Sequence, residues 1–100
     1  MKVLYYAIGK EPEVIEIAPT LKAMQETVGG YIETLTLSNG VVVVCNEEGK
    51  LLDLPLNRTV FFSPTSAEAI MGNFFVCEAS DEDFKDISPK GVEYAEEVIM

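Results

Sequence analysis

One hundred residues suffice for a single domain with one hydrophobic core, and 48% of them are hydrophobic, which argues against a disordered chain. Seventeen Asp and Glu residues against seven Lys and Arg residues give a net charge of −10, the opposite sign from that of a free-standing nucleic-acid binder. No apolar run reaches the ~18 residues of a membrane-spanning helix, and no signal-peptide pattern is present. We therefore expect a cytoplasmic protein with no direct nucleic-acid or membrane partner.

The first third of the chain predicts two paired strands and a helix. Residues 2–8 are typical of a strand, and residues 13–17 alternate between polar and apolar side chains, as in a half-buried strand paired with the first. Leu21, Met24 and Val28 form one apolar helical stripe. The Gly29-Gly30 pair that follows is typical of a helix C-terminus.

A hairpin is predicted next, over residues 31–37 and 41–45. Both segments are rich in β-branched residues, and the intervening Asn39-Gly40 pair is a strong signal for a tight turn between antiparallel strands. Residues 50–52 are predicted to form a further short strand.

The segment that follows predicts less regular structure. Residues 53–62 are predicted to be irregular, because Pro55 cannot lie in a central strand. Thr65 and Glu68 fit a helix capping box, in which each side chain satisfies a free N–H group of the first turn. The pattern therefore predicts a short helix that ends at Gly72.

The last quarter of the chain predicts a strand over residues 74–79, an acidic loop over residues 80–87 and a closing helix that begins at Ser88-Pro89. Taken together, the elements predict one α+β domain over residues 1–100. Its sheet is mostly antiparallel and has five or six strands, with a central helix, a short helix and a C-terminal helix on one face.

The chain contains no histidine and none of the common catalytic motifs. A Ser–His or Cys–His pair is therefore absent, and the carboxylates lie in polar turns rather than in apolar surroundings that would raise a carboxyl pKa. We expect no enzyme activity, no cofactor and no metal site. Cys45 and Cys77 lie in apolar strand-like runs, which indicates two buried reduced thiols, with a disulfide or a metal pair as the alternatives.

A few polar residues are candidate ligand contacts, each with a structural alternative. Arg58 is the only arginine, and a guanidinium binds carboxylate or phosphate through its planar fork. Among so many acids we predict that it pairs with a carboxylate, with Glu47 and Glu48 as candidates. The other candidates lie in turns or beside a helix end, where a purely structural role is the alternative. The possible ligand-binding residues are Tyr31, Asn46, Glu47, Asn57 and Arg58.

The negative charge is concentrated near the C-terminus. From Glu78 to Met100, eight acidic residues face two lysines. Such a segment could bind a basic protein surface, including another protein's nucleic-acid site, or it could simply keep a small protein soluble. The candidate partner-binding residues are Asp81, Glu82, Asp83, Asp86, Glu93, Glu96 and Glu97.

Four blocks of sequence, VGGYIE, VCNEEGKL, LPLNR and GNFFV, occur in this order between residues 28 and 76. They resemble a small family, a domain of unknown function found in short proteins of bacteriophages and mobile elements. The resemblance covers about residues 1–80 and implies a bacterial host cell as the setting rather than a reaction. It carries over no catalytic residue, but it makes Asn46, Glu47, Asn57 and Arg58 candidate polar contacts.

This setting favours one hypothesis over two others. The first is a non-enzymatic phage or mobile-element protein that inhibits a host defence system, of the anti-CRISPR or anti-restriction type, by placing its acidic segment on a basic host protein as a DNA mimic. The first alternative is an oligomeric sponge that sequesters a nucleotide signal, with Arg58 on a phosphate. The second is a structural or regulatory domain that self-associates as a homo-oligomer, with one residue of each pair Tyr5-Tyr6 and Phe61-Phe62 facing outward.

Overall fold

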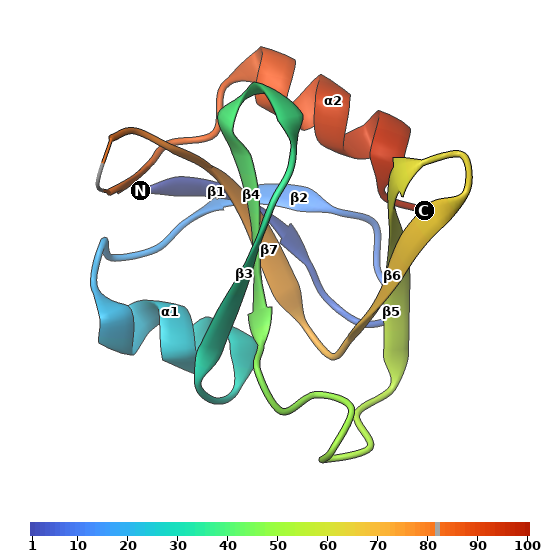
Figure 1. The fold of residues 1–100 in the computed structure, drawn as a ribbon. Helices are drawn as coiled ribbons and strands as arrows, with labels where there is room; N and C mark the ends of the chain where they lie inside the picture. Colours follow the sequence, from blue (N-terminus) through green and yellow to red (C-terminus); the bar gives the residue numbers. More distant parts are fainter. Residues whose placement is uncertain (82) are drawn as a thin grey trace.

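A central antiparallel sheet organises the chain in the computed structural model, which describes residues 1–81 and 83–100 (Figure 1). The sheet has six strands in the order β2-β1-β7-β4-β3, with β8 paired to β7. Two further strands, β5 and β6, form a separate antiparallel hairpin. The strands are β1 (Lys2–Tyr6), β2 (Glu13–Glu16), β3 (Ile32–Thr36), β4 (Val41–Asn46), β5 (Leu56–Ser63), β6 (Ser66–Met71), β7 (Phe74–Ala79) and β8 (Phe84–Lys85).

The middle strands of the sheet are apolar along their length because both of their faces are covered. In β7, Val76 lies opposite Leu4 of β1 on one side and Val43 of β4 on the other. Every residue of β4 is buried. A strand buried on both faces favours a continuous hydrophobic run over alternation.

Two hydrophobic cores lie on the two faces of this sheet. Along β4, Val41, Val43 and Cys45 belong to one core, whereas Val42 and Val44 belong to the other. Alternate side chains of a strand point to opposite faces, so this division follows directly from the extended backbone.

Helix α1 (Leu21–Val28) covers the second core, into which it places Met24 and Val28. The Thr20 side chain accepts a hydrogen bond from the Ala23 N–H and caps the N-terminus. At the other end, Gly29 takes a left-handed conformation with φ of 79°, which glycine adopts without steric cost.

The first core is covered by helix α2 (Pro89–Val98) and by the β5–β6 hairpin. Ala95 and Ile99 pack into it beside Val60 of β5 and Ile70 of β6. Ser88 caps α2, and Pro89 occupies its first turn. Because α1 and α2 lie on opposite faces of the sheet, the expectation that the helices share one face is wrong.

The sequence predictions for residues 50–72 are wrong in three places. Residues 50–52 form a turn, not a strand, and the segment predicted to be irregular contains β5. The short helix predicted from Thr65 to Gly72 is strand β6 instead. Its pairing with β5 and the burial of Ile70 and Val60 outweigh the local capping pattern. Two α-helices are present in the described residues, along with a short 3-10 turn at Ser38–Gly40.

The predicted hairpin between β3 and β4 is confirmed, with Leu35 opposite Val43 in the antiparallel register. Asn39 and Gly40 both have positive φ angles, 63° and 74°, as the tight turn requires. The strand pair β1–β2 and both capped helices are also confirmed. No helix of the described residues is long and apolar enough to cross a membrane.

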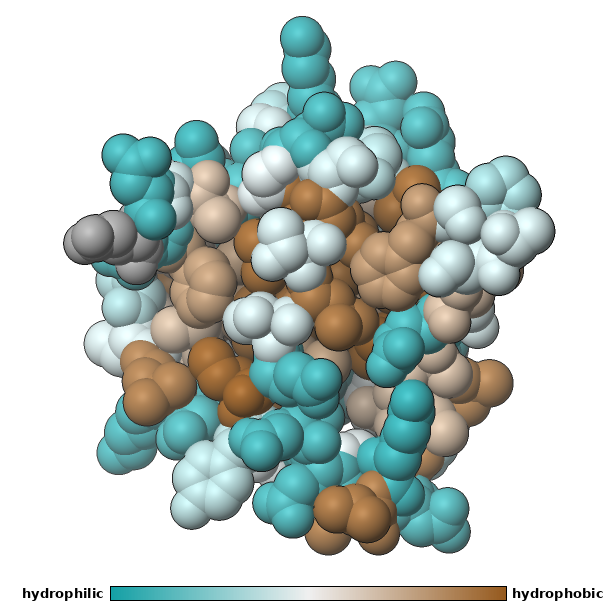
Figure 2. Space-filling model, in the orientation of Figure 1, coloured by the Kyte–Doolittle hydropathy of each residue, from teal (hydrophilic) through white to brown (hydrophobic). Residues whose placement is uncertain are grey.

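The surface seen in Figure 2 is hydrophilic along much of its edge and more hydrophobic towards its centre, below α2. A separate hydrophobic spot lies at the bottom of this view, over the connection between β4 and β5. Leu51 and Leu52 of that connection are 84% and 56% exposed.

Candidate functional site

The sequence blocks between residues 28 and 76 meet at one end of the sheet, around the buried side chain of Asn46. The Asn46 Nδ2 atom donates a hydrogen bond to the Val28 carbonyl at 3.3 Å, and its Oδ1 atom accepts one from the Glu48 N–H at 2.8 Å. A Cβ atom at Gly30 would lie only 2.9 Å from Asn46 Nδ2. Asn46 is the one buried polar residue in the described part of the chain, and it joins the end of α1 to the turn after β4.

Asn57 on β5 and Asn73, between β6 and β7, also hold neighbouring segments together through hydrogen bonds between their side chains and the backbone. The Asn57 Nδ2 atom donates to the carbonyls of Tyr6 and Gly72, at 2.9 and 2.8 Å. The Asn73 Oδ1 atom accepts from the Ile8 N–H at 2.9 Å. These amides satisfy backbone groups that the sheets leave without partners. Asn46 and Asn57 were candidate ligand contacts, but their side chains are engaged within the fold.

Arg58 does not pair with a carboxylate within residues 1–81 and 83–100, so that prediction is wrong. Its guanidinium donates to the carbonyls of Asn57 and Lys10, at 3.0 and 2.9 Å, and to the Asn57 Oδ1 atom. It also lies 5.5 Å from the centre of the Tyr6 ring, within cation–π range. Arg58 therefore ties β5 to the turn after β1, and neither Glu47 nor Glu48 is its partner.

The Tyr6 hydroxyl beneath this arginine is buried and has no hydrogen-bond partner in the described residues. Burial raises the pKa of Tyr6 to about 12, the Glu96 carboxylate adds to this rise, and Arg58 opposes it. The Tyr6 ring stacks on Phe74 with 4.6 Å between the ring centres. Tyr6 is therefore a core residue that cannot serve as an outward contact.

Tyr31 and Glu47 are the remaining candidate ligand contacts, and the structure brings their backbones together. The Glu47 N–H donates to the Tyr31 carbonyl at 2.9 Å. Tyr31 is 65% exposed, and Glu47 is also exposed. The five candidate residues thus divide into an exposed pair beside β3–β4 and a hydrogen-bonded pair on β5, with Asn46 buried between α1 and the turn after β4.

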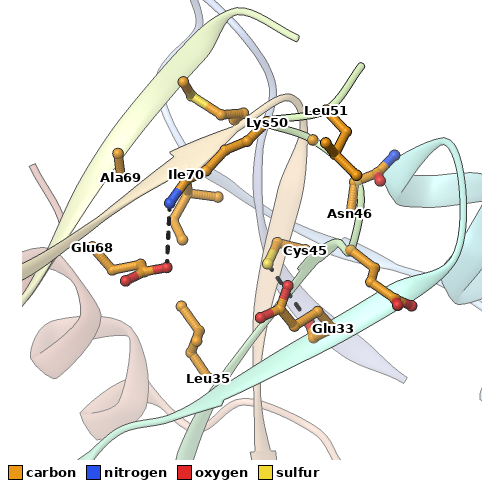
Figure 3. Close-up of a pocket in the computed structure, with 12 residues that line it drawn as sticks. Glu33, Leu35, Cys45, Asn46, Lys50, Leu51, Glu68, Ala69 and Ile70 are labelled. Carbon is orange, nitrogen blue, oxygen red and sulfur yellow. Dashed lines mark hydrogen bonds and ion pairs between the residues drawn. The ribbon is translucent and has the colours of Figure 1, made fainter. Parts of the chain in front are cut away.

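A groove of about 200 Å³ lies between edge strand β3 and the hairpin strand β6 (Figure 3). Cys45 and Ile70, both buried, contribute to its lining, as do the carboxylates of Glu33 and Glu68. Lys50 forms an ion pair with Glu68 at 3.5 Å, which is the one ion pair in the part of the chain that the structure describes. With both side chains substantially exposed, this pair contributes little to stability.

The cysteine in this groove is not an activated nucleophile. The pKa of the Cys45 thiol is raised to about 11, mainly by burial and in smaller part by the nearby Glu33 and Glu68 carboxylates, while Lys50 opposes the rise. Burial likewise raises the pKa of Cys77 to about 12. Both thiols are free and buried, and they belong to the cores on opposite faces of the sheet. The prediction of two buried reduced thiols is therefore confirmed. A thiol that stays protonated is also a poor nucleophile.

The acidic C-terminal segment divides into a loop and a helix face. Asp81, Asp83 and Asp86 are exposed on the connection from β7 to α2, and Glu82 lies outside the described residues. Two of these carboxylates have local roles, because Asp83 accepts from the Phe84 N–H and Asp86 from the Lys2 N–H. Glu93, Glu96 and Glu97 are exposed on α2. Residues three and four apart share one face of a helix, so these three carboxylates form one surface.

The groove residues Glu33, Lys50 and Glu68 were not among the sequence candidates. Their proximity depends on the packing of the β5–β6 hairpin beside β3 and β4, which no local pattern indicated. Phe61 and Phe62, by contrast, were predicted to contribute one outward-facing side chain, and they are 36% and 47% exposed. The expectation that only one of these two phenylalanines faces outward is wrong, because this end of β5 extends beyond the sheet (Figure 1).

The family described as "Domain of unknown function (DUF3846)" matches residues 1–99. The chain belongs to this family. The match extends beyond the four sequence blocks and includes the acidic loop and α2, so the DUF3846 domain spans both cores. No curated protein matches the chain, and no solved structure does.

Proposed function

We propose that this DUF3846 domain is a non-enzymatic binding protein of a phage or mobile element, and that it inhibits a host defence protein by covering a basic surface. The exposed face of α2 carries the proposal. Glu93, Glu96 and Glu97 make no ion pair within residues 1–81 and 83–100, so their charge is available to a partner. An acidic surface of this kind steers association with a basic partner and suppresses binding to nucleic acid.

The chemistry of the two thiols supports a binding role over catalysis. Both have a pKa well above neutral, at about 11 and 12, and both are enclosed by the cores. The nucleotide-sponge alternative has less support, because the Arg58 and Asn57 side chains already bind carbonyl groups of the chain itself. A phosphate would have to displace those bonds to reach the guanidinium.

The test measures inhibition of DNA cleavage by purified restriction endonucleases and CRISPR effectors of bacterial hosts, together with direct binding at increasing salt. The variant E93Q/E96Q/E97Q removes the charge from α2. The matched control E26Q/E48Q/D53N removes the same charge from exposed residues on α1 and the β4–β5 connection, at the other end of the molecule (Figure 1). Exposed charges are screened beyond ~8 Å at physiological ionic strength, so only charges at the interface should matter strongly.

We expect the α2 variant to weaken binding to the inhibited enzyme by at least about tenfold, and the control variant to have a much smaller effect. Equal losses in both variants would show that net charge alone drives the binding. Failure to inhibit any of these enzymes, with no salt-dependent binding to them, would overturn the proposal.

A further inference from the structure

An apolar groove borders the acidic face of α2. Its walls are the tip of the β5–β6 hairpin, with Phe61, Phe62 and Pro64, and the C-terminal end of the chain, with Val98 and Met100. The hollow measures about 440 Å³. Phe61, Phe62 and Met100 are 36%, 47% and 70% exposed, so these three large apolar side chains of the groove face solvent together. Figure 1 shows the C-terminus beside this hairpin.

The backbone fixes the two walls relative to each other. The N–H groups of Thr59 and Met100 each donate to the other residue's carbonyl, at 2.8 and 2.9 Å. Val60 and Ile99 form the adjacent antiparallel bridge, and both are buried in the core. The groove is therefore built on paired, anchored backbone, and a partner would meet a surface that needs no ordering on binding.

Charge decides which occupant suits this groove. Glu97 lines it, and Glu93 and Glu96 continue the negative surface along the same helix. A second copy of the chain would bring another net charge of −10 against it. A basic partner would gain from the same carboxylates. Apolar anchors at the centre with charged groups at the rim are the usual anatomy of a protein interface.

We propose that this groove, defined by Phe61, Phe62, Val98 and Met100, receives an apolar side chain from a Lys/Arg-rich segment of a partner protein, whose cationic residues contact the α2 glutamates. The inference rests on the proposed binding function and adds to it the anchor point. Apolar burial supplies the affinity, and charge supplies the orientation and the rate of association.

The probe is a fluorescein-labelled peptide of roughly 15 residues in which leucines form one helical face and lysines the other. A second peptide has serine in place of each leucine and therefore the same charge. Anisotropy titrations compare the two peptides on the wild-type chain, on F62S/M100S, and on the control L51S/L52S, which removes exposed leucines outside the groove.

We expect the wild-type chain and the L51S/L52S control to prefer the leucine peptide by about tenfold, the value for burial of one apolar side chain. F62S/M100S should bind both peptides equally. E93Q/E96Q/E97Q should weaken both peptides while the leucine preference remains.

Four results would overturn the inference. The first is a leucine preference that persists in F62S/M100S. The second is no preference in the wild-type chain although both peptides bind in a salt-dependent way, and in that case the acidic surface and the proposed function survive without the groove.

The third is that neither peptide shows salt-dependent binding, in which case the charge argument of the proposed function fails as well. The fourth is concentration-dependent dimerisation of the wild-type chain that F62S/M100S abolishes, which would assign the groove to a second copy.

Discussion

Replacement of Asn46 by alanine tests whether this candidate contact residue serves the fold or a ligand. The substitution removes the amide that is hydrogen-bonded to Val28 and Glu48 and leaves a carbonyl and an N–H group without partners. An orphaned buried group costs about 1–3 kcal/mol, but the Val28 bond is long at 3.3 Å and the Glu48 N–H is only partly buried. We therefore expect N46A to lower the free energy of unfolding by about 1–3 kcal/mol.

Urea denaturation followed by circular dichroism measures this loss. The control is E47A, at an exposed neighbouring residue whose side chain makes no hydrogen bond in the described part of the chain. It should change the free energy of unfolding by less than about 0.5 kcal/mol. An N46A protein as stable as the control would refute the structural role of Asn46 and would favour a role in ligand binding instead.

A double-mutant cycle with Gly30 sharpens the test. A Cβ atom at Gly30 would lie 2.9 Å from Asn46 Nδ2, so G30A should destabilise the wild-type chain by displacing that amide. In the N46A background the displaced atoms are gone, and the added methyl group should cost little. We expect a coupling free energy of at least about 0.5 kcal/mol, whereas additive effects would contradict the contact.

Three further predictions follow from the groups around the two cores. The pKa values of Cys45 and Cys77 in the folded chain are about 11 and 12, against an ordinary value of 9.0. The two thiols therefore contribute fully to the free energy of unfolding below pH 9, and this contribution is lost as the pH rises from 9 towards 12. A urea midpoint that stays constant from pH 8 to 11 would contradict this prediction. R58A should cost about 1–3 kcal/mol without salt dependence, since the arginine binds carbonyls rather than carboxylates; a strong salt dependence would point to a missed ion pair. G91A should destabilise α2 because its Cβ would clash with the Glu78 carboxylate, and E78A should reduce that penalty; equal penalties in both backgrounds would count against the contact.

Local signals predicted those elements whose structure depends on nearby residues. Asn39-Gly40 identified the β3–β4 hairpin, and Ser88-Pro89 identified the start of α2. The hairpin strand β6 was mistaken for a helix because Thr65 and Glu68 fit a helix capping box and Gly72 follows as a stop signal. Its conformation is set by pairing with β5 and by burial against the sheet, which a local pattern does not contain.

The candidate site was harder to predict because its contacts span long distances along the sequence. The hydrogen bond from Asn46 to Val28 crosses 18 positions, and that from Asn57 to Tyr6 crosses 51. In this chain the polar residues of these sequence blocks close loops, because their side chains bind backbone groups far away in the sequence. The Lys50–Glu68 pair likewise spans 18 positions and exists only because the hairpin packs beside the sheet.

The placement of the α2 glutamates is unfavourable for the helix itself, which is the strongest physical reason to assign them a function. Glu93 and Glu97 are like charges one turn apart, and Glu96 and Glu97 lie in the last turn, where the helix dipole favours cations. No basic residue compensates for them in that turn. We therefore expect E96Q/E97Q to stabilise the domain by about 0.5–1.5 kcal/mol in low salt while it weakens binding to a basic partner. A thermal melt and a binding titration on the same protein measure both effects. If the variant is less stable than the wild-type chain, these carboxylates stabilise the fold, and this argument for a basic partner at the acidic surface fails.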